Sequence, residues 1–213
     1  MLFDLDGTLL DTLKDLADSM NTVLSQHGLN AYPVKNYRHF IGRGLEQLVR
    51  SVLPKDNIND KIVEEYLSAM KLEYAKRWAD STNPYPGIPD LLNELTKLDL
   101  PMVVLSNKSD NFTQIMVKTL LPGGQFIIVH GHKDTVAAKP DPASALDIAD
   151  ELKIQPKDFL YLGDTSIDMQ TAEAAGMYAV GVLWGFHTDE ELKANGAKVL
   201  VESPLQVLEL LKH

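Results

Sequence analysis

Cysteine is absent from this chain of 213 residues. Without cysteine the protein has no disulfide, no thiolate nucleophile and no thiolate ligand for a metal. Thiol redox chemistry is excluded for the same reason. Any catalytic or metal-binding group must therefore be sought among the other side chains.

Long apolar runs are also absent. No uninterrupted run approaches the ~20 apolar residues that a membrane-spanning helix needs, and no charged leader followed by an apolar segment opens the chain. We therefore expect a cytoplasmic protein without a membrane partner. The first strand would contain little more than Leu2, Phe3 and Leu5, so we also expect a few natural residues to precede Met1.

Positive charge is scarce. Lys and Arg number 20 against 30 Asp and Glu, which gives a formal net charge of -10. This balance argues against a surface built to bind nucleic acid or anionic lipid, although it allows a local basic pocket for a small anion. Any anionic substrate must then be met by local groups or by a bound cation.

The remaining composition is that of an ordinary soluble globular protein. Hydrophobic residues make up 45% of the chain and charged residues 23%, both near the average for this class. The length allows a sizeable core, as one large domain or as a domain with a smaller insert.

Two hydrophobic patterns divide the chain. From Thr12 to about Trp78 the apolar residues recur at helical spacing, which predicts three or more helices in a small bundle. Beyond a proline-rich turn region at residues 81–89, short β-rich runs alternate with helical segments. These runs are MVVLS, QFIIVHG, DFLYLGD, YAVGVLW and KVLVES. Such alternation is typical of a parallel sheet wrapped by crossover helices.

The two patterns predict an α/β protein with an insertion. We expect residues 1–12 and 84–213 to form a doubly wound parallel-sheet, Rossmann-like core, with FDLDGT as its first strand. Residues 13–83 would form a helical bundle inserted directly after that strand. Ligands of open α/β sheets bind beyond the carboxyl ends of the strands. The insert leaves from that edge, so we expect it to act as a cap, with a hinge at its two links.

Polar and charged residues gather at the ends of the predicted strands. Asp4 and Asp6 are spaced i and i+2, so a strand would direct both carboxylates to one face. Each residue of this kind has an ordinary explanation alone, such as a turn, a helix cap or a solvated lysine. Their joint position after successive strands indicates a functional site instead. The others are Ser106, Asn107, Lys139, Asp164 and Asp168.

The residue types favour phosphoryl chemistry. Hard oxygen ligands without cysteine suit Mg²⁺, which would also relieve the repulsion between carboxylates. A carboxylate is a competent nucleophile toward phosphorus, and a second carboxyl can act first as general acid and then as general base. Two aspartates would thus serve two roles. We expect Ser106, Lys139, the metal and backbone amides beyond Gly7 to bind the phosphoryl oxygens. Thr8 and Asn107 are further candidates for contact with the substrate.

The motifs FDLDGT, LSNKS, AAKPDP and LGDTSID, in this order, resemble the four motifs of the haloacid dehalogenase superfamily of phosphatases and phosphotransferases. The resemblance implies that Asp4 is the nucleophile and that Asp6 is the general acid/base, whose backbone carbonyl also binds Mg²⁺. It further implies that Ser106 binds the phosphoryl group and that Lys139 steadies this group and the nucleophile. Asp164 would ligate the metal. Asp168 is also counted among the metal-site residues, although in the family the acid at this position more often supports the metal site than binds the metal directly.

Three features of the resemblance concern the substrate. The helical insert resembles the family's α-helical cap, and the stretches SNK, IGRGLEQLV and VLWGFHTDEEL look most like the phosphoglycolate phosphatase branch. Dehalogenases of the family lack the second acid of the first motif, so Asp6 argues against dehalogenation. In the cap, Arg43 could bind a substrate carboxylate or second phosphate, or lie in a flexible loop without a ligand. A small phosphorylated metabolite is the expected substrate.

Other readings stay open. Within enzymes the alternatives are a phosphotransferase of the β-phosphoglucomutase type and a small pyrophosphatase. Outside enzymes, a phospho-accepting signalling module also gathers acids, a hydroxyl and a lysine around Mg²⁺. His130 and His132 have the spacing of a zinc pair, but we expect no metal there, and we assign Trp184 and Phe186 to packing. The oligomeric state is expected to be a monomer or a small homo-oligomer.

Overall fold

The computed structural model describes residues 1–55 and 58–212. The chain divides into two compact units. The sheet unit comprises Met1–Leu10 and Pro84–His213, and the helical unit comprises Asp11–Asn83. The first boundary therefore lies two residues before the position expected from the sequence, and the second lies at the expected position.

The helical unit contains three α-helices. They are α1 (Leu13–Gln26), α2 (Leu45–Val52) and α3 (Asp60–Arg77). A 3-10 helix, Val34–His39, lies between the first two. Helix α1 forms because its apolar residues recur every three or four positions, so that Leu16, Met20 and Val23 are all buried. The helices predicted from the spacing are present.

A buried carboxylate joins the two ends of the helical unit. Asp15 on α1 is only 2% exposed. It accepts hydrogen bonds from the amides of Ser81 and Thr82 at 3.0 and 2.9 Å, and from the Thr82 hydroxyl at 2.8 Å. The segment that follows α3 is thereby held against the first turn of α1.

The sheet unit contains a six-stranded parallel sheet in the order β5-β4-β1-β6-β7-β8. Strand β1 is central, and Leu2 is in register with Val103 of β4 and Tyr161 of β6. This sheet confirms the predicted α/β class with a helical insertion. The strands are β1 (Leu2–Phe3), β4 (Met102–Ser109), β5 (Phe126–His132), β6 (Leu160–Gly163), β7 (Tyr178–Val182) and β8 (Val199–Val201).

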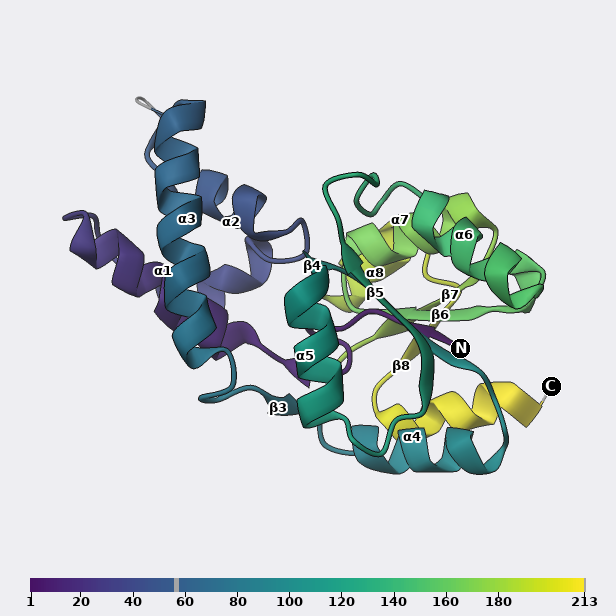
Figure 1. Cartoon of the computed structure of the whole chain (residues 1–213). Helices are drawn as coiled ribbons and strands as arrows, with labels where there is room; N and C mark the ends of the chain where they lie inside the picture. The colour runs from purple at the N-terminus through teal and green to yellow at the C-terminus, as the bar shows by residue number, and fades with distance from the viewer. Residues whose placement is uncertain (56–57, 213) are drawn as a thin grey trace. The chain divides into compact units, whose positions relative to one another are not determined.

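Helices cover both faces of this sheet. Helices α6 and α7 lie on one face, and α4 lies on the other with the C-terminal 3-10 helix (Figure 1). Strands buried on both sides have nearly continuous apolar sequences, as MVVL and LYL illustrate. The helices are α4 (Ile88–Lys97), α5 (Asp110–Leu120), α6 (Ala143–Leu152), α7 (Ser166–Ala175) and α8 (Asp189–Ala194), with 3-10 helices at Pro156–Asp158 and Pro204–Lys212.

The two links between the units pair with each other. Strands β2 (Leu10–Asp11) and β3 (Asn83–Pro84) form a separate two-stranded sheet. Within the sheet unit, the Tyr85 amide donates to the Leu9 carbonyl at 3.1 Å. The outgoing and returning segments are therefore adjacent, which the sequence did not predict.

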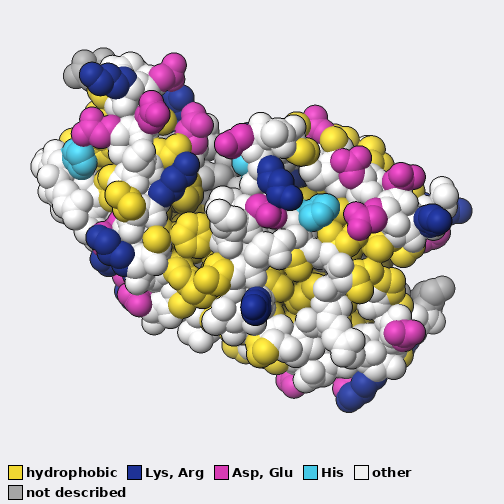
Figure 2. Space-filling view, in the orientation of Figure 1, with side chains coloured by type: hydrophobic (Ala, Val, Ile, Leu, Met, Phe, Trp, Pro, Cys, Tyr) yellow, Lys and Arg dark blue, Asp and Glu magenta, His cyan; other side chains and the backbone are white. Residues whose placement is uncertain are grey.

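Surface charge is mixed on the face in view. Figure 2 shows acidic and basic side chains interspersed there, with apolar side chains between them. None of the helices in residues 1–55 and 58–212 combines the length and the hydropathy needed to cross a bilayer.

Candidate active site

Neighbouring strands bring three aspartates to one edge of the sheet. Asp4 follows β1 directly, and its amide donates to Leu162 of β6 at 2.9 Å. Asp164 follows the last residue of β6, and Asp168 lies in the first turn of α7. Because β1 and β6 are adjacent and parallel, their carboxyl ends meet at the same place.

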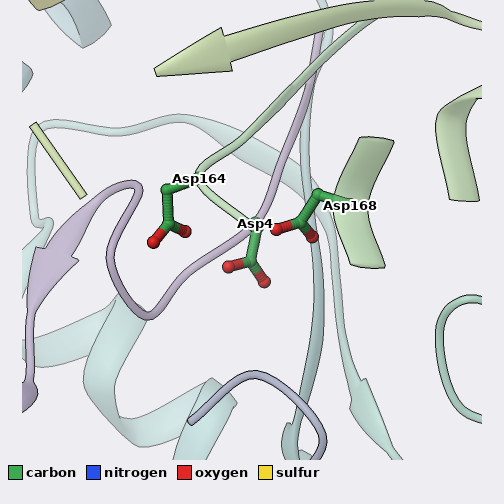
Figure 3. A group of neighbouring side chains, drawn as sticks. All are labelled: Asp4, Asp164 and Asp168. Carbon is green, nitrogen blue, oxygen red and sulfur yellow. The ribbon is translucent and has the colours of Figure 1, made fainter. Parts of the chain in front are cut away.

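The three carboxylates form a compact buried cluster. One oxygen from each of Asp4, Asp164 and Asp168 lies within 4.8 Å of the others. Figure 3 shows their side chains close together, although Asp4 comes from a different part of the chain than the other two. Their exposed fractions are 6%, 0% and 1%. The sequence predicted this convergence from strand ends alone.

Lys139 joins two of these acids. Its Nζ donates to Asp4 Oδ1 at 2.6 Å, to Asp168 Oδ1 at 2.7 Å and to the Leu105 carbonyl at 3.0 Å. The Asn107 side chain fixes the backbone beneath it, accepting from the Lys139 amide at 2.8 Å and donating to the Lys139 carbonyl at 3.0 Å. Asn107, predicted to contact substrate, thus also positions the lysine.

Asp168 is engaged through both oxygens. Its Oδ1 accepts from Lys139, and its Oδ2 accepts from the Thr165 amide at 3.1 Å and the Thr165 hydroxyl at 2.6 Å. Thr165 and Asp168 form the capping box of α7. These contacts favour a supporting role for Asp168 over direct metal ligation.

Asp164 is held from two sides. Thr8 donates its hydroxyl to Asp164 Oδ1 at 2.9 Å, and the Phe186 amide donates to Oδ2 at 2.9 Å. Thr8 was predicted to contact substrate, but its fully buried hydroxyl is directed to Asp164. Trp184 donates its indole N–H to the Thr8 carbonyl at 2.9 Å. The segment after β7, which the sequence assigned to packing, therefore supports the site.

Glycine allows the close approach of backbone to Asp164. A Cβ atom on Gly7, whose φ is +90°, would lie 2.1 Å from Asp164 Oδ2. A Cβ atom on Gly185 would lie 2.2 Å from the Asp164 Cβ. Gly7 was expected from the turn after β1. Gly185 was not, because a glycine between two aromatic residues resembles an ordinary loop residue.

The second aspartate of the first motif has its own lysine. Lys108 Nζ lies 3.1 Å from Asp6 Oδ2. Beside this pair, the buried Ser106 accepts a hydrogen bond from the Lys108 amide through its Oγ at 3.2 Å. The sequence did not single out Lys108, because a lysine in a polar loop is usually solvated.

Burial and like charges shift the pKa values in the cluster. Burial, with the nearby Asp168 carboxylate, raises the pKa of Asp4 from 3.8 to about 7, although Lys139 acts in the opposite direction. Burial and the neighbouring carboxylates also raise the pKa of Asp164 well above its usual value. Burial lowers the pKa of Lys139, but Asp168 and Asp4 outweigh it, so that this pKa lies well above normal.

The donor set fits a divalent cation. Asp4, Asp164 and Asp168 offer carboxylate oxygens to one point. With Asp6 included, four carboxylates face the two ammonium groups of Lys108 and Lys139, which leaves a formal charge of −2. All the offered ligand atoms are oxygens. Burial and the neighbouring carboxylates raise the pKa values of Asp4 and Asp164, and a bound cation would favour the charged forms of both. Hard oxygen donors of this kind suit Mg²⁺.

Arg43 lies in the other unit. It is exposed, in a bend between Gly42 and Gly44, which have φ values of 111° and 83°. Arg43 is not part of the carboxylate and lysine cluster in the sheet unit. The predicted contact of Arg43 with substrate stays a prediction.

His130 and His132 lie in β5, in register with Leu105 and Ser109. With Ser106 they line a cavity of about 110 Å³. Among the described residues, neither histidine belongs to a group of three or more potential metal ligands.

Comparisons with known proteins agree with this geometry. The sequence profile of the haloacid dehalogenase-like hydrolases matches residues 1–182. A phosphoglycolate phosphatase of Aquifex aeolicus is 33% identical over 186 residues, which is 87% of this chain and 85% of that protein. A phosphoglycolate phosphatase of Pseudomonas putida is 31% identical over 206 residues, 95% of this chain and 75% of that protein.

Solved structures share the fold over nearly the whole chain. A protein of Lactobacillus delbrueckii subsp. bulgaricus superimposes with a TM-score of 0.90 at 29% identity, covering 99% of this chain and 96% of that chain. A haloacid dehalogenase-like family protein of Streptococcus pneumoniae gives a TM-score of 0.88 at 25% identity, with the same coverage.

Proposed function

Because the chain belongs to the haloacid dehalogenase-like hydrolase family, we propose that it is a Mg²⁺-dependent phosphatase of small phosphate monoesters, with 2-phosphoglycolate as the first candidate substrate. The observation that carries this proposal is the buried cluster of Asp4, Asp164, Asp168 and Lys139, with Asp6 and its lysine beside it. The cluster combines a nucleophile, a proton carrier and counter-charges at one sheet edge.

The first half-reaction transfers the phosphoryl group to the enzyme. An oxygen of Asp4 attacks phosphorus, the bond from phosphorus to the ester oxygen breaks, and Asp6 gives its proton to the departing alcohol. Lys139, bonded to Asp4 Oδ1, orients the nucleophile and offsets negative charge. Ser106 would donate to a phosphoryl oxygen. The products are the free alcohol and an aspartyl phosphate on Asp4.

The second half-reaction releases phosphate. Asp6, now a carboxylate, takes a proton from a water molecule as the water oxygen attacks phosphorus. The bond between phosphorus and Asp4 breaks, which restores the carboxylate and frees inorganic phosphate. Asp6 thereby ends the cycle protonated, as it began.

The carboxylates of Asp4 and Asp164 and the backbone carbonyl of Asp6 would hold the cation, with Asp168 in support. When bound, Mg²⁺ supplies positive charge to the carboxylates and to the phosphoryl oxygens. Thr8 and the Phe186 amide fix Asp164 from behind. Such outer contacts orient a metal ligand and tune its affinity.

The names of the relatives support the substrate class. Two relatives at 31% and 33% identity are named phosphoglycolate phosphatase. We propose that Arg43, exposed in the helical unit, recognises the substrate's carboxylate or a second phosphate. The second aspartate at position 6 supports hydrolysis of phosphate esters rather than dehalogenation.

The test is phosphate release from a panel of small esters, measured with and without Mg²⁺. The panel contains 2-phosphoglycolate, pyrophosphate and β-glucose 1-phosphate, and Asp4→Asn serves as the blank. We expect Mg²⁺-dependent turnover with one preferred ester, and none in the variant, whose fold stays intact. Near-normal turnover by highly purified Asp4→Asn would contradict the covalent mechanism. No hydrolysis of any ester by the wild type would favour a mutase or a phospho-accepting module.

A further inference from the structure

We propose that Lys108 is the positioning residue of the general acid/base: by its contact with Oδ2, it holds the Asp6 carboxyl group in the orientation from which the leaving oxygen is protonated. This inference rests on the proposed phosphatase function. It assigns a role to a residue for which the sequence gave none.

The topology of the sheet brings the two residues together. Strands β1 and β4 are parallel neighbours, with Phe3 in register with Val104. Asp6 follows Phe3 by three positions, and Lys108 follows Val104 by four. Both residues therefore lie beyond the last positions at which β1 pairs with β4, at the carboxyl edge of the sheet.

The contact is close and shielded from solvent. Lys108 Nζ lies 3.1 Å from Asp6 Oδ2, and the side chains are 4% and 13% exposed. Placing an ammonium group out of water is costly unless an opposite charge accompanies it. The Lys108 side chain is therefore stabilised where it lies by the Asp6 carboxylate.

The backbone of Lys108 is anchored on both sides. Its amide donates to Ser106 Oγ at 3.2 Å, and its carbonyl accepts from the Thr113 hydroxyl at 3.2 Å. Thr113 lies on the buried side of α5. The lysine thus extends from a fixed point, as a positioning group requires.

Asp6 depends on this contact for its orientation. Within the described residues, the buried Oδ1 of Asp6 has no hydrogen-bond partner. The ion pair at Oδ2 is then the contact that selects one orientation of the carboxylate. Each aspartate of the first motif consequently has its own lysine: Lys139 contacts the nucleophile, and Lys108 contacts the proton carrier.

The test uses the leaving group as the probe. Protonation of the leaving oxygen matters for alkyl esters and hardly for p-nitrophenyl phosphate, whose nitrophenolate departs without a proton. The value of kcat/KM reports only the steps up to transfer of the phosphoryl group to Asp4. It is measured for wild type, Lys108→Met and Lys108→Arg with p-nitrophenyl phosphate, an uncharged alkyl phosphate and 2-phosphoglycolate. Lys97→Met, an exposed lysine on α4 paired with Glu94, is the matched control.

We expect Lys108→Met to lower kcat/KM by about 100-fold for both alkyl esters and by less than about 5-fold for p-nitrophenyl phosphate, since general acid catalysis contributes about 10²–10⁴. Lys108→Arg should restore most of the loss. An equal loss for all three esters would show a merely structural role and overturn the proposal. A loss confined to 2-phosphoglycolate would show that Lys108 binds the substrate carboxylate, which also overturns it.

A stability cycle tests the contact separately from turnover. The melting temperature is measured for wild type, Lys108→Met, Asp6→Asn and the double variant. We expect Lys108→Met to act differently in the two backgrounds, because in Asp6→Asn the ion pair is already lost. Equal shifts of the melting temperature in both backgrounds would show that Lys108 and Asp6 do not interact, and would overturn the proposal. If the wild type releases phosphate from no ester, the proposed function fails and this inference fails with it; if the wild type is active, the variants decide the inference alone.

Discussion

At the scale of single residues, Asp4 is subject to opposing forces. Burial and Asp168 favour its neutral form, whereas Lys139 favours the carboxylate. As the proposed nucleophile, Asp4 must be ionised to act, so the residue is held in an environment that opposes its proposed active form. A bound cation would stabilise the ionised form of Asp4. Removal of the cation should therefore change how the free energy of unfolding depends on pH.

The metal-free protein should therefore lose stability as the pH rises. The pKa of Asp4 is 3.8 when unfolded and about 7 when folded. Below 3.8 both states are protonated and the group contributes nothing. Between the two values only the unfolded state ionises, so the native state becomes less favourable with increasing pH, and above about 7 the loss levels off.

Asp4→Asn removes this ionisation. In the presence of a chelator, we expect the stability advantage of the variant over the wild type to grow by about 3 kcal/mol from about pH 5 to about pH 8, because one pKa unit is worth about 1.4 kcal/mol. Thermal unfolding of both proteins across this range measures the difference. Parallel pH profiles would show that Asp4 ionises normally in the fold. Addition of Mg²⁺ should reduce the difference in stability between the variant and the wild type.

The contacts behind Asp164 should govern metal affinity. We expect Asp164→Asn to raise the Mg²⁺ concentration for half-maximal activity by about 100-fold, and Thr8→Val, which removes the hydroxyl donor to Oδ1, by about 10-fold. Magnesium titrations of phosphate release provide the measurement. Thr8→Ser keeps the donor and should resemble the wild type. If Thr8→Val instead raised KM for the ester at saturating Mg²⁺, the residue would act on substrate, as first predicted.

At the scale of elements, the strands of the large sheet were predictable from the sequence. The buried polar contacts of Lys108 and Asp15 were not. Runs such as MVVLS carry an apolar signal because both sheet faces are covered, and four such strands place Asp4, Asp164 and their neighbours at one edge. Strands β2 and β3 have two residues each and carry no periodic signal. Lys108 and Asp15 were missed because a charged residue reveals its burial only through a partner distant in sequence.

Asp15 illustrates the cost of removing such a partner. Asp15→Ala leaves the Ser81 and Thr82 amides without their acceptor, so we expect a loss of about 2–4 kcal/mol in the free energy of unfolding. Asp18→Ala, on the same helix, removes an ion pair with the exposed Lys14 and should cost much less. Chemical denaturation distinguishes the two. Similar losses would show that the buried bonds do not stabilise the link.

At the scale of the whole molecule, each unit has its own interior. A core cluster including Leu2, Val103, Ile148 and Tyr161 lies entirely in the sheet unit. The chain leaves and returns side by side, since Leu9 and Tyr85 are hydrogen-bonded. The sheet unit therefore requires little of the insert for its own stability.

Joining Leu10 to Pro84 through a short glycine linker should give a folded protein. We expect its circular dichroism and cooperative melting to be those of an α/β domain, because the core cluster and the hydrogen bond between Tyr85 and Leu9 are retained. Its kcat/KM preference for the best ester over p-nitrophenyl phosphate should fall by about 10-fold or more, since the substrate contact proposed for Arg43 is lost. Unchanged preference would place selectivity in the sheet unit, and a non-cooperative melt would show that the units depend on each other.

The central position of β1 has a consequence for biosynthesis. Leu2 lies beside Val103 and Tyr161, so the strand made first acquires its neighbours only after both later segments have been translated. Until then Asp4, the proposed nucleophile, follows an unpaired apolar segment, and pairings between distant segments form slowly. A ribosome-bound chain that ends before β6 lacks both the second neighbouring strand of β1 and Asp164. Enzymatic activity should thus emerge only after β6 has been translated, rather than gradually during elongation.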